Sequence, residues 1–125
     1  MPLLESTRHF VNAETIARMK DGVTIINCAR GELMNIPDMI RGIETQKIGA
    51  LALDVFDKED GIYHENRRDD ILSNRDMAYL RQFPNVIMTQ HMAFYTDAAV
   101  QSMVYCGIEG LCDFAKTGHT ETELV

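Results

Sequence analysis

Three short apolar runs, at 23–27, 48–54 and 85–89, constrain the fold of this sequence more than any other feature. The run VTIIN at 23–27 is apolar on both faces, which is typical of a parallel strand that helices cover on both sides. Segments with helical spacing of apolar residues lie before, between and after the runs. This alternation predicts an α/β fold whose parallel strands are joined by right-handed crossovers.

The predicted helices have clear boundary signals. Each begins after a residue that caps helix N termini well or ends at a helix breaker. We expect helices over 12–20, 35–46, 75–83 and 97–116, the first capped by Asn12, the second by Asn35 and the last by Thr96, with Gly118 ending it. Val11 and Ile16 are spaced as a hydrophobic staple for the first helix. Residues 57–74 are polar and irregular, and long loops of this kind often carry function.

Length and composition narrow the class of protein. A chain of 125 residues has room for one small core. A sheet of three strands has two open edges, so we expect the chain to belong to a larger fold or to pair with another chain. The net charge of −7 argues against a nucleic-acid partner. The N-terminus does not resemble a signal peptide, and no apolar run approaches the ~18 residues that span a membrane, so a cytoplasmic location is expected.

The sequence has three cysteines, Cys28, Cys106 and Cys112. An odd number without a CxxC pair favours neither a disulfide framework nor a zinc site. Cys106 and Cys112 lie in the apolar pattern of the last predicted helix, so we expect both thiols to be buried.

Polar side chains follow all three predicted strands. Arg30 comes shortly after the first, Asp54 ends the second with Glu59 just beyond it, and His91 follows the third. If the strands are parallel, these groups share the carboxyl edge of the sheet, where open α/β folds bind their ligands. A guanidinium can hold a carboxylate and polarise a neighbouring carbonyl. Histidine paired with a carboxylate can transfer a proton near neutral pH. The set suits reduction of a 2-oxo acid, with the hydride supplied by a cofactor.

The same residues have plainer interpretations. A single histidine after a strand is more often structural than catalytic. Arg30 could cap a helix or pair with Glu32. Glu59 stands in a charged run that could be a solvated loop.

Three long segments, 2–35, 49–59 and 85–103, resemble motifs of the D-2-hydroxyacid dehydrogenases, in order and with appropriate gaps. The first contains INCARG, the second reads GALALDVFDKE, and the third contains TQHMAFYT. AFYT and the long segment before the third strand resemble the D-lactate dehydrogenase branch. The resemblance implies the C-terminal half of a Rossmann-like NAD-binding domain plus a long C-terminal helix. It divides the chain into 1–95, the domain half, and 96–125, a helix and tail returning to a substrate domain outside this sequence.

The resemblance also implies roles for individual residues. Arg30 matches the arginine that binds the substrate carboxylate and carbonyl, Glu59 the partner of the catalytic histidine, and His91 the acid/base. Phe94 matches an aromatic residue that shapes the substrate pocket. The substrate-binding residues implied are therefore Arg30, His91 and Phe94. The NAD contacts implied are Met1, Pro2, Thr7, Cys28, Ala29, Arg30 and Asp54. The implied partners are a small 2-oxo or 2-hydroxy acid and a second copy in a homodimer, without nucleic acid or membrane.

Two departures from the family pattern bear on function. Gln90 stands where the family usually has proline before the histidine, which removes no chemical group. The Gly-rich turn that cradles the dinucleotide pyrophosphate is missing from this sequence. We therefore expect a pyruvate/D-lactate dehydrogenase as the longer parent protein, with this part alone inactive. The alternatives are a catalytically inactive half-domain or interaction module, and a dinucleotide-sensing scaffold, which AFYT and the acidic charge make the weaker of the two.

Overall fold

The computed structural model describes residues 1–59, 61–64, 66 and 74–121. The chain divides into two compact units, Met1–Met92 and Ala93–Val125, and each is described by itself. Part of the predicted irregular segment 57–74 lies outside the described residues. No helix in the described part of the chain is long and apolar enough to cross a membrane.

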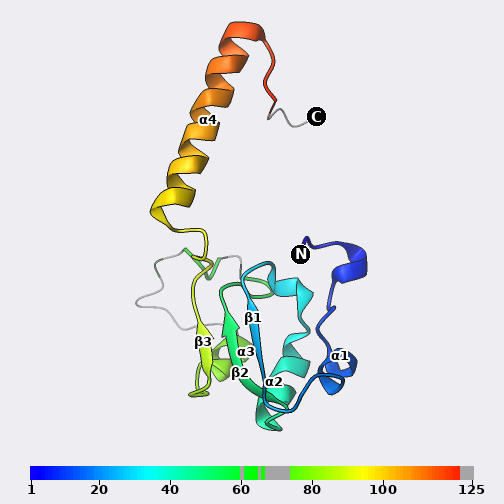
Figure 1. Ribbon diagram of the computed structural model, residues 1–125. Helices are drawn as coiled ribbons and strands as arrows, with labels where there is room; N and C mark the ends of the chain where they lie inside the picture. Colours follow the sequence, from blue (N-terminus) through cyan, green and yellow to red (C-terminus); the bar gives the residue numbers. More distant parts are fainter. Residues whose placement is uncertain (60, 65, 67–73, 122–125) are drawn as a thin grey trace. The chain divides into compact units, whose positions relative to one another are not determined.

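The first unit contains a parallel sheet of three strands, β1 (Val23–Asn27), β2 (Ile48–Leu53) and β3 (Val86–Met88), in the spatial order β1-β2-β3. The arrows of all three strands run in the same direction in Figure 1. The predicted runs are therefore strands, each within one residue of its expected bounds at either end. Their carboxyl ends meet at one edge, as the sequence pattern predicts.

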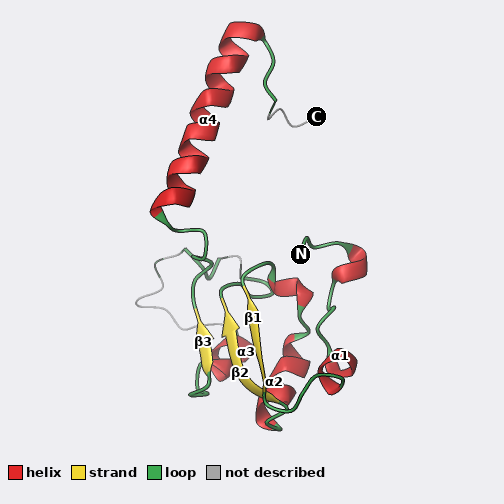
Figure 2. Cartoon of the chain, viewed as in Figure 1, coloured by secondary structure: helices red, strands yellow, loops and turns green. Residues whose placement is uncertain are grey.

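The helices of this unit begin at asparagine caps. They are α1 (Ala13–Ala17), α2 (Ile36–Glu44) and α3 (Arg75–Leu80), with short 3₁₀ turns η1 (Glu5–Thr7) and η2 (Gly31–Leu33) (Figure 2). The side-chain oxygens of Asn12, Asn35 and Asn74 each accept a hydrogen bond from the first turn of the helix that follows. All three helices are shorter than the predicted ranges 12–20, 35–46 and 75–83. In α1, the apolar stripe supplies only Ile16 to the core, so packing holds little more than one turn.

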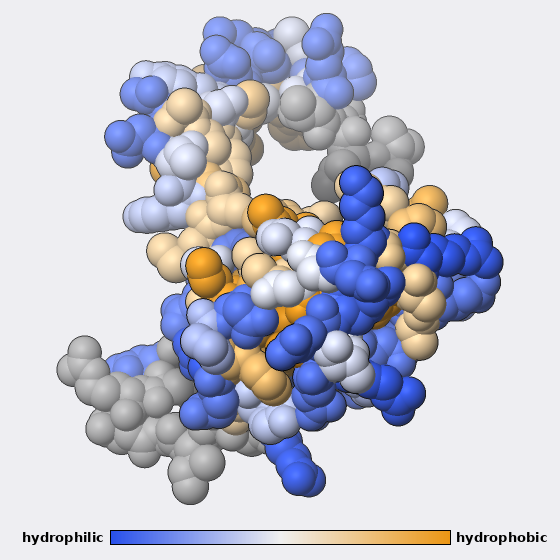
Figure 3. Space-filling model, turned by 60° about the horizontal axis from the view of Figure 1, so that its bottom comes forward, coloured by the Kyte–Doolittle hydropathy of each residue, from blue (hydrophilic) through white to orange (hydrophobic). Residues whose placement is uncertain are grey.

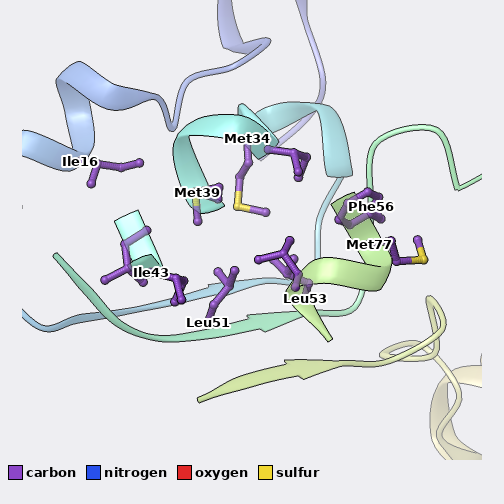
Figure 4. Packing of buried hydrophobic residues seen from close by; sticks show 11 residues of the cluster. Ile16, Met34, Met39, Ile43, Leu51, Leu53, Phe56 and Met77 are labelled. Carbon is purple, nitrogen blue, oxygen red and sulfur yellow. The ribbon is translucent and has the colours of Figure 1, made fainter. Parts of the chain in front are cut away.

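One hydrophobic core joins the helices to the sheet. Met39 and Ile43 of α2 pack over Leu51 and Leu53 of β2 (Figure 4). Ile16, Met77 and Leu80 bring α1 and α3 into the same cluster, and Phe56 lies beside Met77 in the close view. Burial of these side chains, most of them under 5% exposed, is the main stabilising contribution available to this unit.

On the opposite face of the sheet, the described residues of the first unit supply no covering helix, although the apolar runs are typical of strands covered on both sides. Ile26 and Ile87 are 69% and 66% exposed. Both are paired with Ala52 in the register, so the three form a row across the sheet. Right-handed crossovers between strands in sequential order place every connecting helix on the same face. Apolar residues on both faces of a strand therefore did not predict which face the helices of this unit pack against.

The second unit consists mainly of α4 (Asp97–Thr117). The Thr96 hydroxyl accepts a hydrogen bond from the Ala99 N–H, and Gly118 ends the helix with φ of 72°. This confirms the predicted helix and both boundary residues. Cys106 and Cys112 are exposed, so the prediction of buried thiols was wrong. The apolar pattern of α4 is real, but its side chains, including Leu111 at 73%, remain exposed. Figure 3 shows hydrophobic areas of the surface, in orange, among hydrophilic areas in blue.

Candidate active site

The turn that presents Arg30 is built by Asn27, the last residue of β1. The Asn27 Nδ2 donates to the Arg30 carbonyl at 2.8 Å, and its Oδ1 accepts from the Ala29 N–H at 3.0 Å. Asn27 is buried, so these bonds form away from solvent. The exposed Arg30 side chain folds back once, with Nη1 donating to the Ala29 carbonyl at 2.6 Å. Neither plainer interpretation is seen among the described contacts. Arg30 makes no side-chain cap to η2 and no ion pair with Glu32.

Asp54 connects the ends of β2 and β3. Its Oδ1 accepts from the Thr89 hydroxyl at 2.5 Å and from the Met92 N–H at 2.8 Å. Its carbonyl accepts from the His91 N–H at 2.6 Å, and its own N–H donates to the Asn27 carbonyl at 2.9 Å. The carboxylate is 5% exposed. Asp54 therefore fixes the backbone that carries His91, in addition to any direct role toward a ligand.

Glu59 and His91 form a close pair at the same edge. The Glu59 Oε1 lies 2.5 Å from the His91 Nδ1, and the Glu59 Oε2 accepts from the Phe56 N–H at 2.8 Å. The two side chains are 22% and 33% exposed. Because a carboxylate only accepts, Nδ1 carries the hydrogen in this contact, which leaves Nε2 outside the pair with Glu59. His91 has φ of 53°, an uncommon left-handed conformation for a residue other than glycine.

Two aromatic residues next to this pair were not predicted from the sequence as site residues. The His64 ring centroid lies 6.3 Å from that of His91. The Tyr63 hydroxyl is buried, and no hydrogen-bond partner for it exists among the described residues. Burial, with the nearby carboxylates of Glu59 and Asp54, raises the pKa of the Tyr63 phenol, so it stays protonated. Both residues lie in the irregular segment after β2, where no periodic pattern marks a position.

The predicted cofactor contacts at the N-terminus lie in one small structure. The Thr7 hydroxyl donates to the Pro2 carbonyl at 2.9 Å and accepts from the Leu4 N–H at 2.8 Å. Met1 lines a hollow of about 250 Å³ along β1 together with Ile25 and Ala29. A mostly apolar hollow of this kind fits a flat ring of a dinucleotide. No group of three metal-binding side chains occurs within the described residues.

Phe94 belongs to the second unit. Its ring meets that of Tyr95 edge to face at a centroid distance of 6.0 Å, and it is 46% exposed. Its carbonyl accepts from the Thr96 N–H just before α4 begins.

The structure thus brings Glu59, His91 and Asp54 into direct contact and places the turns of Cys28, Ala29 and Arg30 at the same edge. The guanidinium of Arg30 makes no contact with Glu59 or His91 in the described part of the chain. Asn27 and Thr89 were missed, although each is a polar residue at the end of an apolar run, and that is the signal that marks Asp54.

A parallel α/β sheet with an imidazole–carboxylate pair at its carboxyl edge defines part of a ligand-binding domain equipped for proton transfer. Residues 1–93 match the family model of the D-isomer specific 2-hydroxyacid dehydrogenase, NAD binding domain. The chain belongs to this family, which confirms the predicted membership, the α/β fold class and NAD as the family's cofactor.

Individual relatives agree with this assignment. The chain is 40% identical to an aromatic 2-oxoacid reductase of Clostridium sporogenes, over 99% of this chain and 38% of the reductase. It matches the structure of a D-lactate dehydrogenase from Sporolactobacillus sp with a TM-score of 0.95 and 31% identity, over 99% of this chain and 37% of that one. The NAD-complexed D-isomer specific 2-hydroxyacid dehydrogenase of Lactobacillus delbrueckii ssp. bulgaricus matches with a TM-score of 0.91 and 28% identity, over 99% and 38%. The chain spans less than two fifths of the length of these relatives.

Proposed function

We propose that this chain is the proton-transferring part of an NAD-dependent D-2-hydroxyacid dehydrogenase that interconverts pyruvate and D-lactate. The observation that carries the proposal is the 2.5 Å contact between the Glu59 Oε1 and the His91 Nδ1 at the carboxyl edge of the sheet. Glu59 orients the imidazole. When the ring is doubly protonated, Nε2 can give its proton to the carbonyl oxygen of a 2-oxo acid, and the neutral ring can take a proton back on Nε2 in the reverse direction.

Arg30 would hold the carboxylate of the substrate. Its guanidinium is exposed at the same sheet edge, and its planar set of donors matches a carboxylate in two-point contact. The bond from Nη1 to the Ala29 carbonyl limits the rotation of the side chain. We assign Phe94 to the substrate pocket on the resemblance alone.

The residues proposed to contact NAD are Met1, Pro2, Thr7, Cys28, Ala29, Arg30 and Asp54. The hollow along β1 that includes Met1 and Ala29 supports this assignment. Bound NADH supplies the hydride to the carbonyl carbon. Homodimerisation and the return of the 96–125 segment to a substrate domain stay predictions of the resemblance. The cytoplasmic location stays a prediction from the sequence pattern.

The proposal is tested by His91→Gln in the longer enzyme, or in a chimera that takes the uncovered part from the Clostridium sporogenes reductase. We expect pyruvate reduction to fall by about 10²–10⁴-fold, because general acid catalysis contributes that much, while the Kd for NADH changes little. His119→Gln, on the exposed turn after α4, is the matched control and keeps full activity. Unchanged turnover in His91→Gln would remove His91 from the mechanism.

Substrate preference is measured in the longer enzyme and not in the chimera, because the part taken from the reductase would influence which substrate is preferred. Relatives include both an aromatic 2-oxoacid reductase and D-lactate dehydrogenases, so kcat/KM is compared for pyruvate and phenylpyruvate. The proposal expects pyruvate to be preferred. Preference for phenylpyruvate would keep the reaction class and replace the substrate.

An inactive half-domain or interaction module is the second candidate. The exposed apolar side chains of α4 favour it, because large apolar patches mark interaction surfaces. Calorimetric titration of NADH into the 125-residue chain separates the two possibilities. Tight, saturable binding would contradict the interaction-module hypothesis, and weak or absent binding would support it for the chain on its own.

A further inference from the structure

Gly31 lies against the backbone of another loop with no room for a side chain. It follows Arg30 directly, begins η2 and is buried. A Cβ at this position would lie 2.1 Å from the Phe56 carbonyl carbon, 2.3 Å from the Asp57 nitrogen and 2.4 Å from the Phe56 oxygen. These are backbone atoms, so no change of rotamer relieves the collision. The Arg30 turn and the loop after β2 therefore come into close backbone contact at Gly31.

The peptide that Gly31 touches is joined through the Phe56 Cα to the N–H group that holds Glu59. The Phe56 N–H donates to the Glu59 Oε2 at 2.8 Å, and the Glu59 Oε1 faces the His91 Nδ1. The Phe56 side chain is 3% exposed and lies beside Met77 in the core (Figure 4). This anchoring leaves the Phe56–Asp57 peptide little freedom to retreat.

We propose that Gly31 is a positioning residue. Its contact with the Phe56–Asp57 peptide keeps Glu59 within reach of His91, and it keeps the Arg30 turn close to the Glu59–His91 pair. Its relevance to catalysis rests on the proposed dehydrogenase function. A methyl group at position 31 separates the two loops, which moves the Phe56 N–H away from Glu59 and weakens the hold of Glu59 on the imidazole. Proximity effects of this size are large, since a 1 Å displacement can cost about 10²-fold in rate.

The structural part of the proposal is tested in the 125-residue chain by ¹⁵N NMR of the histidine rings. His91 resonances are assigned with His91→Gln, because the sequence has four histidines. We expect the neutral His91 ring to carry its hydrogen on Nδ1 in the wild type, and Gly31→Ala to show a mixture of tautomers. A Gly31→Ala chain that keeps the wild-type tautomer would overturn the proposal.

Gly49→Ala is the matched control. Its Cβ would lie 2.5 Å from the Gly22 carbonyl oxygen, so it imposes the same kind of backbone collision at the start of β2, the strand end away from the site. We expect it to lower stability and leave the His91 tautomer unchanged. Loss of the tautomer in both variants would overturn the proposal, because the effect would then be general loosening. Unfolding of Gly31→Ala alone, seen by circular dichroism, would assign the glycine a purely structural role.

If neither glycine variant folds, Phe56→Leu tests whether the Phe56–Asp57 peptide positions Glu59 against His91. It loosens the anchor of the Phe56–Asp57 peptide without adding an atom, and Met39→Leu is its control in the same core. The proposal expects the His91 tautomer to change only in Phe56→Leu. In the whole enzyme, Gly31→Ala is expected to lower kcat by about 10²-fold with the Kd for NADH unchanged. Retained turnover in His91→Gln would refute the function while leaving the NMR result on Gly31 intact.

Discussion

Removing the Asn27 side chain should destabilise the chain more than removing an exposed asparagine that makes one bond. Asn27 is 7% exposed and makes two side-chain hydrogen bonds, to the Arg30 carbonyl and the Ala29 N–H. Each such bond contributes about 0.5–1.5 kcal/mol, so Asn27→Ala should cost about 1–3 kcal/mol. Asn27→Asp keeps an acceptor for the Ala29 N–H but loses the donor to Arg30, and should fall in between.

The assay is urea unfolding of the 125-residue chain, followed by far-UV circular dichroism. With an m value of about 1.5 kcal/mol/M, Asn27→Ala should lower the midpoint by about 0.7–2 M. Asn85→Ala is the control, because the exposed Asn85 makes one bond, to the Gly49 carbonyl at 2.8 Å. It should cost less than about 1 kcal/mol. Equal midpoints for Asn27→Ala and Asn85→Ala would refute the view that buried bonds hold the Arg30 turn.

Two further predictions concern a buried phenol and the core. The pKa of Tyr63 is raised above its usual 10.0, so the protein loses stability as pH rises through the folded-state value. Between about pH 9 and about pH 11, the urea midpoint should therefore fall less in Tyr63→Phe than in the wild type. The same pH dependence of the midpoint in both proteins would contradict this. Met39 is 0% exposed in the core, so Met39→Ala should cost about 2–5 kcal/mol by urea unfolding. A loss of less than about 1 kcal/mol in the free energy of unfolding would contradict this, because the core around position 39 would then have closed the cavity.

The strands and the Glu59–His91 pair could be predicted because they depend on few assumptions. Apolar β-branched runs fix strand positions, and parallel order alone brings residues after β2 and β3 to one edge. Topology predicted that both residues lie at this edge, and the family resemblance supplied their pairing, because the path of the loop between Leu53 and Glu59 is not specified by the residue pattern.

Other features depend on the backbone path inside loops, which the residue pattern does not specify. Asn27 closes the Arg30 turn through its side chain, and Gly31 matters because of an approach to Phe56 that is remote in sequence. The burial of Cys106 was wrongly predicted for a related reason. An apolar helical pattern shows that a face can be buried, but it does not identify the surface that covers it.

The two faces of the sheet differ in how they can accommodate a substitution. Leu51 and Leu53 pack against α2 and α3 within the first unit, so a change in volume there can be compensated by a substitution in the same unit. Ile26, Ala52 and Ile87 line up across the other face without such neighbours in the described part of this unit. A change of side-chain volume in this row therefore needs no compensating substitution within the described part of the unit.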